Sequence, residues 1–440
     1  MDCIVCKFGG TSMADANTIR KCAEIVKSDA RRKFVVVSAP GKSKTEPLKV
    51  TDALIACHKE VKETGSCKTA FAHVRERFLR MVADLGIDLD IGRYLDEVEA
   101  GIVNNPGNAD YAASRGEYLS AIVFSHVLGL PFVDAKELVF FEKNGHFESE
   151  YSNDKCGEIL GDMDGAVIPG FYGVNRSGKI TTFSRGGSDI TGSVIARAVS
   201  ADVYENWTDV NGFLVADPRI VDNPQKITKL SYKELRELSY MGASVLHADA
   251  IFPVKKAGIP INIRNTFEPE NPGTMIVPHS AYENNGKVVT GIAGKKNFCV
   301  ILIGKSMMNT QLGFARRILS VLEYHEIPYE HMPSGIDTLS VILDTAGHDK
   351  EEIEQVMSEI SAAVQPDSIS FLDNIALVAT VGHGMFKKVG TAARLFTALA
   401  RNNVNVRMID QGSSELNIII GVSNDDYDTC IRAIYEEFFM

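Results

Sequence analysis

Short apolar runs alternate with amphipathic stretches over the first two thirds of the chain. Residues 3–6 form an apolar run that predicts a buried strand, and residues 16–30 carry apolar side chains at helical spacing. Further short strands are predicted at residues 33–38, 131–133, 166–168, 201–204 and 259–263. Strands that alternate with helices indicate an α/β fold, with a mostly parallel sheet covered by helices on both faces. Ligands of such folds gather at the carboxyl ends of the strands.

Three other stretches complete the first part of the chain. Residues 51–125 have a mainly helical pattern that is broken near Gly86 and around residues 104–107. The polar residues 42–49 precede this segment and predict a mobile loop over a ligand. A stretch rich in Pro, Gly and Asn, residues 268–286, predicts a linker to the last third of the chain. We therefore expect a first domain over residues 1–285.

The last third of the chain repeats itself. Residues 301–304 are echoed by 379–382, and residues 338–343 by 415–420. A glycine followed by a helical pattern occurs at Gly313 and again at Gly390, and the offset stays near 77 residues throughout. Each copy predicts the order strand, helix, strand, strand, helix, strand, which indicates two α+β ferredoxin-like domains. We expect them at residues 286–366 and 367–440, with an exchange of strands between the two as an alternative.

Composition limits the classes of protein that fit. A chain of 440 residues is expected to form two or three domains, and a net charge of −11 argues against nucleic acid or an anionic membrane as the main partner. No apolar stretch is long enough to span a bilayer. The eight cysteines are scattered, and Cys3 and Cys6 would point to opposite faces of one strand, so neither a disulfide framework nor a metal site is predicted. This usage is typical of a reduced, cytoplasmic protein.

Two glycine-containing turns are the candidates for chemistry. Lys7, Gly9, Gly10, Thr11 and Ser12 lie between the first strand and the first helix, where backbone N–H groups and the helix dipole can hold a phosphate. The alternative is a tight turn without a ligand, because the pattern is neither that of the Walker motif nor that of the dinucleotide motif. The second turn, residues 184–189, also places a glycine pair between a strand and a helix, so it could bind an anion in the same way, and it adds an arginine and an aspartate.

These motifs resemble those of the aspartate kinases of the amino-acid kinase family. The resemblance rests on Lys-Phe-Gly-Gly-Thr-Ser at residues 7–12, Thr-Thr-Phe-Ser-Arg-Gly-Gly-Ser-Asp at 181–189, Trp-Thr-Asp-Val at 207–210 and Asp-Pro-Arg at 217–219. The two repeats resemble ACT domains, which commonly bind amino acids. Because the motifs follow in order along essentially the whole chain, the resemblance implies an enzyme that converts L-aspartate and ATP, with Mg²⁺, to 4-phospho-L-aspartate and ADP.

The resemblance also implies roles for single residues. Lys7 and Asp189 would be catalytic. The substrate would be bound by Ser38, Thr51, Glu117, Phe171, Arg185 and Ser188, with Glu117 on the α-ammonium group and Arg185 and Ser188 at the carboxylate. The nucleotide would contact Lys7, Gly9, Gly10, Thr11, Ser12, Thr208, Asp209, Arg219, Ser244 and Val245. For Glu117 the alternative is a residue of a first helical turn, placed there for the dipole.

Two departures from the family pattern stand out. Ser244 replaces a lysine that commonly reaches ATP, and Lys255 or Lys256 is a possible substitute. Leu214 stands where the family often has a tyrosine, whereas His247 is expected to be a packed, hydrogen-bonded residue. Alternative functions are a kinase for another acidic amino acid and an amino-acid sensor whose kinase domain has decayed.

Regulation is expected in the first repeat. By resemblance to lysine-sensitive relatives, Glu330 would face the side-chain ammonium group of L-lysine, and the alternative is a solvated strand residue. The implied effector site is Met308, Gly313, Phe314, Tyr329, Glu330 and Ser334. It would lie between ACT-like domains of two subunits, in a homodimer or a dimer of dimers. The pathway implied is the first step of lysine, threonine and methionine biosynthesis.

Overall fold

The computed structural model describes residues 2–184, 186–243, 245–246, 251–278, 281 and 286–440. The chain forms two compact units, each with its own contacts. The first comprises residues 1–213, 226–235 and 244–282, and the second comprises 214–225, 236–243 and 283–440. The division therefore differs from a single boundary at residue 285, because two short segments of the expected first domain pack within the second unit.

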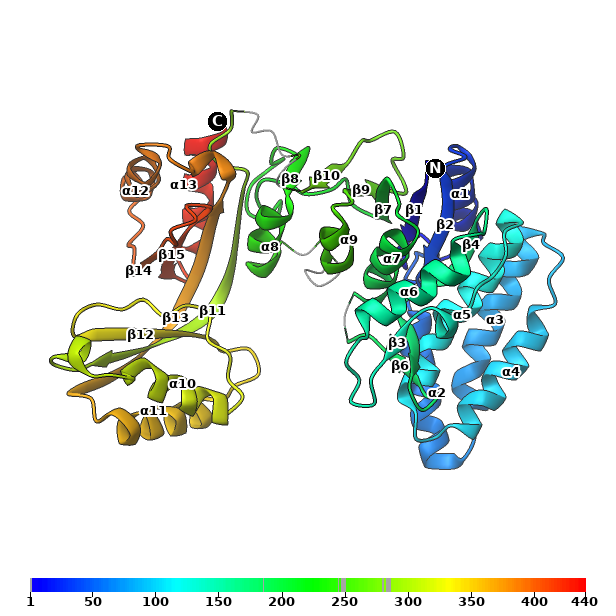
Figure 1. The fold of residues 1–440 in the computed structure, drawn as a ribbon, viewed down its shortest axis with the longest axis horizontal. Coiled ribbons are helices and arrows are strands. Elements are labelled where there is room, and N and C mark those ends of the chain that lie inside the picture. Colours follow the sequence, from blue (N-terminus) through cyan, green and yellow to red (C-terminus); the bar gives the residue numbers. More distant parts are fainter. Residues whose placement is uncertain (1, 185, 244, 247–250, 279–280, 282–285) are drawn as a thin grey trace. The chain divides into compact units, whose positions relative to one another are not determined.

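The first unit is built on a seven-stranded sheet (Figure 1). Its strands, in spatial order, are β4 (Ala166–Pro169), β2 (Arg32–Val37), β1 (Ile4–Phe8), β7 (Val203–Thr208), β9 (Ile261–Asn265), β10 (Thr274–Val277) and β8 (Lys229–Ser231). All neighbours are parallel except β9 and β10. This arrangement confirms the α/β prediction. It also shows that the expected linker is wrong in part, since β10 belongs to the sheet and the Thr274 hydroxyl bonds the carbonyl of Ile227.

Helices cover both faces of this sheet. On one face lie α1 (Ala16–Lys27) and α5 (Ala109–Leu128), joined by α2 (Val50–Thr64), α3 (Lys68–Leu85) and α4 (Ile91–Asn104). On the other face α7 (Gly187–Ala198) packs on β1, β2 and β7, and is flanked by α6 (Ser149–Leu160) and α9 (Phe252–Ala257). Side chains alternate along β1, so Cys6 and Phe8 enter the core beneath α1 and α5, whereas Lys7 points to the α7 face.

Smaller elements complete the first unit. The strands β3 (Phe140–Phe141), β5 (Tyr172–Asn175) and β6 (Ile180–Thr182) form a separate three-stranded sheet, and the 3₁₀ turn η1 spans Ala135–Glu137. Helix α8 (Tyr232–Tyr240) follows β8, and its residues from 236 onward belong to the second unit. Left-handed glycines end several helices; Gly86, with φ of 68°, ends α3 at the break that the sequence predicts.

The second unit contains an antiparallel five-stranded sheet. Its order is β12 (Thr338–Asp344), β11 (Gly291–Gly304), β13 (Ser368–Val381), β15 (Asn417–Ser423) and β14 (Met408–Asp410). Its helices are α10 (Phe314–Tyr324), α11 (Lys350–Val364), α12 (Thr391–Arg401) and α13 (Tyr427–Phe439), with short 3₁₀ turns η4 (Met308–Thr310) and η5 (His383–Met385). The long strands β11 and β13 begin 77 residues apart and run side by side, with α10 and α11 near one end and α12 and α13 near the other (Figure 1).

The second repeat differs from its predicted order. It ends with helix α13, so the expected final strand is wrong. The place of that strand is taken by the start of β11, where residues 291–295 pair with residues 377–381 of β13. The rest of β11 pairs with the first half of β13 and with β12. Each long strand therefore serves both repeats.

Candidate active site

Lys7 and Asp189 form an ion pair at the carboxyl end of the parallel sheet. The Lys7 Nζ lies 2.6 Å from Asp189 Oδ1, and the two side chains are 10% and 15% exposed. Lys7 is supplied by β1 and Asp189 by the first turn of α7. The Nδ2 of Asn206, on β7 directly beside Lys7, donates a 2.8 Å hydrogen bond to the same carboxylate oxygen. The lysine charge is thus held in one position, with little access to water.

Asn206 is a site residue that the sequence analysis missed. The sequence does contain a signal for it, which is a polar residue within a predominantly buried strand. Asn206 is 3% exposed. The register that places Asn206 opposite Lys7 comes only from the pairing of β1 with β7.

The first glycine turn brings three chain segments into close contact. The N–H of Gly9 donates to the carbonyl oxygen of Trp207 at 3.0 Å, so this amide is already used. A Cβ on Gly10 would lie 3.1 Å from the Ala39 oxygen, and one on Gly41 would lie 2.6 Å from the Gly10 carbonyl carbon. The turn therefore requires glycine at position 41 and leaves only tight space for a Cβ at position 10. In the described part of the chain, the amides of Gly10 and Thr11 have no hydrogen-bond acceptor and can receive an anion.

The helix start next to Lys7 belongs to α7. The sequence analysis expected the dipole of α1 at the first turn, but α1 begins at Ala16 and its N-terminus is capped by the Asp15 carboxylate, which accepts from the Thr18 N–H at 3.0 Å. The N-cap of α7 is Gly186, in the left-handed region with φ of 58° and without a side-chain cap. The first amides of α7 are therefore the ones open to an anion.

Glu117 is a buried carboxylate without a full set of partners. Its side chain belongs to α5, the residue is 5% exposed, and its Oε2 has no hydrogen-bond partner. Burial raises the pKa of Glu117 to about 8, opposed by the N–H of Ala39. Helix α5 comes this close to the end of β2 because residue 116 is glycine, where a Cβ would lie 2.6 Å from that of Ala39. Since α5 begins at Ala109, Glu117 is not in a first helical turn, and the dipole alternative is wrong.

The remaining substrate candidates lie on neighbouring segments. Ser188 is 8% exposed and packs so closely on Gly170 that a Cβ there would lie 2.6 Å from the Ser188 Oγ. Phe171 has a positive φ of 78°, and its N–H donates to the Thr191 hydroxyl at 3.2 Å. Ser38, directly after β2, and Thr51, in the first turn of α2, are both half-buried. Arg185 lies outside the described residues.

The candidate nucleotide residues that the structure describes are divided between the two units. Thr208 ends β7, and its hydroxyl donates to Asp209 Oδ1 at 3.3 Å. Arg219 belongs to the second unit, where it pairs with Asp217 at 2.5 Å and lowers the pKa of that carboxyl. Val245 is described within a turn, whereas Ser244 and His247 lie outside the described residues. Lys256, a suggested substitute for the missing lysine, pairs with Glu150 at 2.8 Å.

The candidate effector residues fall into two groups, one at or just before the start of α10 and one on the chain beside β12. Gly313 has a φ of 73° and precedes α10 without a side-chain cap, and Met308 and Phe314 are buried in the apolar cluster beneath that helix. The N–H of Glu330 donates to the Ile342 carbonyl at 2.8 Å. Tyr329 is half-exposed, and Ser334 forms a bridge to Leu339.

Glu330 has a side-chain partner in the second unit. Desolvation and a hydrogen bond to the Glu330 carboxylate together raise the pKa of the Tyr240 phenol. Glu330 is itself only partly exposed, and lies in a bend rather than in a strand. The carboxylate is therefore held by a neighbour and is not simply a solvated strand residue.

Comparison with known proteins agrees with this architecture. The model of the amino acid kinase family matches residues 2–265, and a model of the ACT domain matches residues 378–438. Aspartokinase 3 of Bacillus subtilis is 38% identical over 99% of this chain and 98% of its own length. A crystal structure of Clostridium acetobutylicum aspartate kinase, described as an allosteric enzyme, is 49% identical, covers both chains fully and has a TM-score of 0.90. Escherichia coli aspartokinase III, solved with lysine and aspartate, is 25% identical with a TM-score of 0.76 over both full chains.

The chain belongs to the amino acid kinase family, and within that family to the aspartokinases. The resemblance inferred from the motifs is confirmed, as are the enzyme class and the presence of ACT-type regulatory repeats. Among the described residues, no helix is long and apolar enough to cross a membrane.

Proposed function

We propose that this aspartokinase transfers the γ-phosphoryl group of ATP to the side-chain carboxylate of L-aspartate, giving 4-phospho-L-aspartate and ADP. The observation that carries the substrate assignment is the buried Glu117 carboxylate, whose Oε2 lacks a partner. A buried unpaired carboxylate is costly, and a cationic ligand group removes that cost. The α-ammonium of an amino acid is such a group. Ser188 and Arg185 are proposed to bind the carboxylate end of the substrate.

The chemistry needs no general base. The attacking group is a carboxylate with a free pKa near 3.9, already ionised at neutral pH. What remains is to bring two anions together and to stabilise the charge spread over the transferring phosphoryl group. Lys7 supplies a fixed positive charge, and Asp189 and Asn206 hold it in place. The free amides of Gly10 and Thr11 and the open start of α7 supply further donors.

The residues present fit a nucleotide bound with Mg²⁺. Among the described residues no three His, Cys, Asp or Glu side chains converge on one point, which excludes an all-protein cage in that part of the chain. Mg²⁺ needs none, because it commonly binds through substrate phosphates, waters and one or two carboxylates. Asp189 is the carboxylate closest to Lys7 and is proposed to serve there. When bound, the ion neutralises charge on the phosphate oxygens.

Steady-state release of ADP tests the reaction directly. We expect ADP to form only when both ATP and L-aspartate are present, with hydroxylamine trapping the acyl phosphate as a hydroxamate. Glutamate and N-acetylaspartate serve as matched alternative acceptors. If either compound is phosphorylated as fast as aspartate, the assignment of aspartate as the substrate is rejected. If the protein binds aspartate but forms no ADP, the sensor alternative is favoured.

We further propose that L-lysine inhibits the enzyme by binding at the first repeat. The support is that the first repeat carries both the acidic Glu330 and the uncapped start of α10, groups suited to the ammonium group and to the carboxylate of an amino acid. A solved relative, E. coli aspartokinase III, was crystallised with lysine and aspartate. The effector must bind an inactive arrangement more tightly, because equal affinity for both states shifts nothing. We place the site at an interface between ACT-type repeats of two subunits in a homodimer.

Replacement of Glu330 tests the effector site. Glu330→Ala removes the proposed partner of the lysine side chain, so the concentration for half-inhibition should rise by about tenfold or more, as for the loss of a charged hydrogen bond. Turnover without lysine should stay close to that of the wild type. Tyr240→Phe is a matched control, since it frees Glu330 from its neighbour without removing the carboxylate. Unchanged inhibition in Glu330→Ala, or a wild type indifferent to millimolar lysine, would reject this site.

A further inference from the structure

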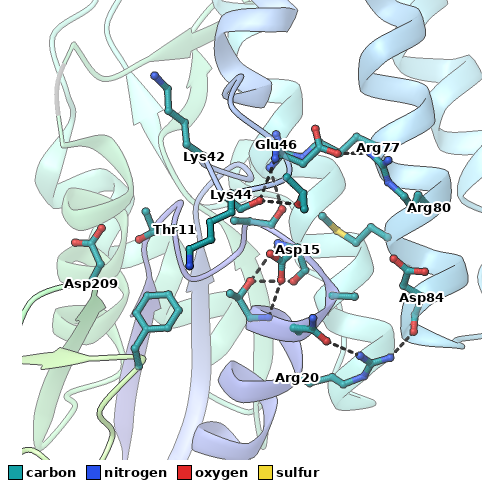
Figure 2. Close-up of a pocket in the computed structure, with 18 residues that line it drawn as sticks. Thr11, Asp15, Arg20, Lys42, Lys44, Glu46, Arg77, Arg80, Asp84 and Asp209 are labelled. Carbon is teal, nitrogen blue, oxygen red and sulfur yellow. Dashed lines mark hydrogen bonds and ion pairs between the residues drawn. The ribbon is translucent and has the colours of Figure 1, made fainter.

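A cavity of about 860 Å³ lies beside the first glycine turn, within the first unit. Figure 2 shows Thr11 and Asp209 on one side of it, and Glu46, Arg77 and Arg80 on the other. Thr11 and Asp209 are candidate nucleotide residues, so the cavity adjoins the place where the nucleotide is proposed to bind. The loop between β2 and α2, residues 42–46, forms part of its wall.

Two of the acidic groups of the cavity are already engaged. The Asp15 carboxylate caps α1 through the Thr18 N–H. The Glu46 carboxylate forms an ion pair with Arg80 on α3, with His73 at 3.9 Å from its other oxygen. Asp84 and Asp209 also line the cavity, so its wall holds four carboxylates against five cations, which are Arg20, Lys42, Lys44, Arg77 and Arg80.

Arg77 is a buried cation in this wall that no carboxylate neutralises through an ion pair. It is 2% exposed, and its guanidinium donates to the carbonyl oxygens of Gly41 at 2.6 Å, Leu48 at 2.7 Å and Ala14 at 2.9 Å. Its Nε has no partner. The carbonyls of Gly41 and Leu48 lie at the two ends of the loop and that of Ala14 lies just before α1, and none of the three forms an ion pair with the guanidinium. An anion in the cavity is therefore favoured by the field of Arg77.

The loop presents two lysines that differ in direction. A tight turn fixes it, because the Ser43 N–H donates to the Glu46 carbonyl at 2.9 Å and the Glu46 N–H to the Ser43 hydroxyl at 3.2 Å. Lys42 and Lys44 are both exposed, and neither forms an ion pair with any described residue. Both lysines line the cavity, but in Figure 2 the Lys44 side chain extends toward the side of Thr11, whereas the Lys42 side chain extends in another direction.

We propose that Lys44 binds the polyphosphate of the nucleotide in this cavity, and that Lys42 does not. The inference rests on the proposed use of a nucleoside triphosphate and adds a specific contact to it. A lysine ammonium is a mobile point charge that suits phosphate oxygens. Lys7 is held in place by its ion pair with Asp189. Lys44 would add a second cation, on a side chain that is free to move toward the phosphates. The loop that carries Lys44 follows β2, whose carboxyl end also supplies Ser38 for the substrate.

Equilibrium binding of Mg·ADP to the full chain tests the contact without turnover. Lys44→Met keeps the apolar stem and removes the charge, so the Kd for Mg·ADP should rise about tenfold or more. Lys42→Met, on the same turn, should change it less than about twofold, as for an exposed charge outside the contact. Adenosine, which has no phosphate, should bind the wild type and Lys44→Met equally. Lys44→Arg should recover most of the lost affinity.

Three outcomes would overturn the proposal. The first is an unchanged Kd for Mg·ADP in Lys44→Met, and the second is a rise of that Kd in Lys42→Met as large as in Lys44→Met. The third is a loss of adenosine affinity in Lys44→Met as large as its loss of Mg·ADP affinity, which would show a loosened loop and not a lost phosphate contact. The assignment of the reaction fails separately. A wild type that binds Mg·ADP but forms no product from aspartate would reject the proposed reaction, and the difference between the two lysine variants would still decide the role of Lys44.

Discussion

Lys7→Ala should lower kcat by about two orders of magnitude or more, the range seen when one preorganised electrostatic contact is removed. The Lys7 ammonium is held 2.6 Å from Asp189 with little exposure to water, so the charge that we propose to act on the transferring phosphoryl group is already in position. Water would replace this charge poorly, because solvent must reorient as the transition state forms. The KM for aspartate should change much less, since the substrate contacts proposed for Glu117 and Ser188 do not involve Lys7.

Steady-state kinetics with separate variation of ATP and aspartate measures this effect. Lys33→Ala is a matched control, because Lys33 lies on the neighbouring strand β2 and outside the site. Removal of Lys7 leaves the Asp189 carboxylate with Asn206 as its side-chain partner, so thermal unfolding of the variant must be recorded beside the kinetics. A folded Lys7→Ala protein that keeps most of its turnover would show that Lys7 is only the structural partner of Asp189.

Local sequence patterns were enough to predict many of the helices and strands of the first unit. Apolar runs and helical spacing placed β1, β2, β4, α1 and the end of α3 within a few residues of their observed bounds. They did so because each of these elements is buried on a face that its own residues specify. The pairing of Lys7 with Asp189 could not be read the same way, since it depends on β1 lying beside β2 and β7 with α7 across them.

The errors have a common physical origin. Strand β10 is short and flanked by Pro, Gly and Asn, so composition indicates a linker, and only its pairing with β9 and β8 makes it a strand. The missing last strand of the second repeat is replaced by residues 291–295, far away in the sequence. Glu117 lies beyond the first turn of α5 because the helix already includes residues 112–113, small residues that pack against the core without an apolar pattern. Strand order and helix packing are tertiary choices that a local pattern leaves open.

Glu117→Gln should lower kcat/KM for aspartate by an amount that corresponds to a loss of roughly 2 to 5 kcal/mol in transition-state stabilisation, as for removing one member of a desolvated charge pair. The amide keeps the size of the side chain and loses only the charge that the α-ammonium needs. Succinate lacks the amino group, so it should be a poor substrate for the wild type, and the variant should discriminate much less between succinate and aspartate. A wild type that uses succinate as well as aspartate would refute the pairing.

The pH dependence of stability gives a second readout of the same carboxyl. Burial raises its pKa to about 8 in the unliganded protein, against 4.5 for the ordinary value. Between these values the native state binds more protons than the unfolded state, so the free energy of unfolding falls as pH rises. The contribution of the Glu117 carboxyl is fully present below pH 4.5 and is lost as pH rises through about 8. Glu117→Gln removes this loss, and its free energy of unfolding should exceed that of the wild type increasingly toward pH 8. Aspartate should stabilise the wild type at that pH and the variant much less, because only the wild type carries a carboxylate for the substrate ammonium. Identical pH profiles of unfolding for the two proteins would show that Glu117 is already charged and paired without substrate.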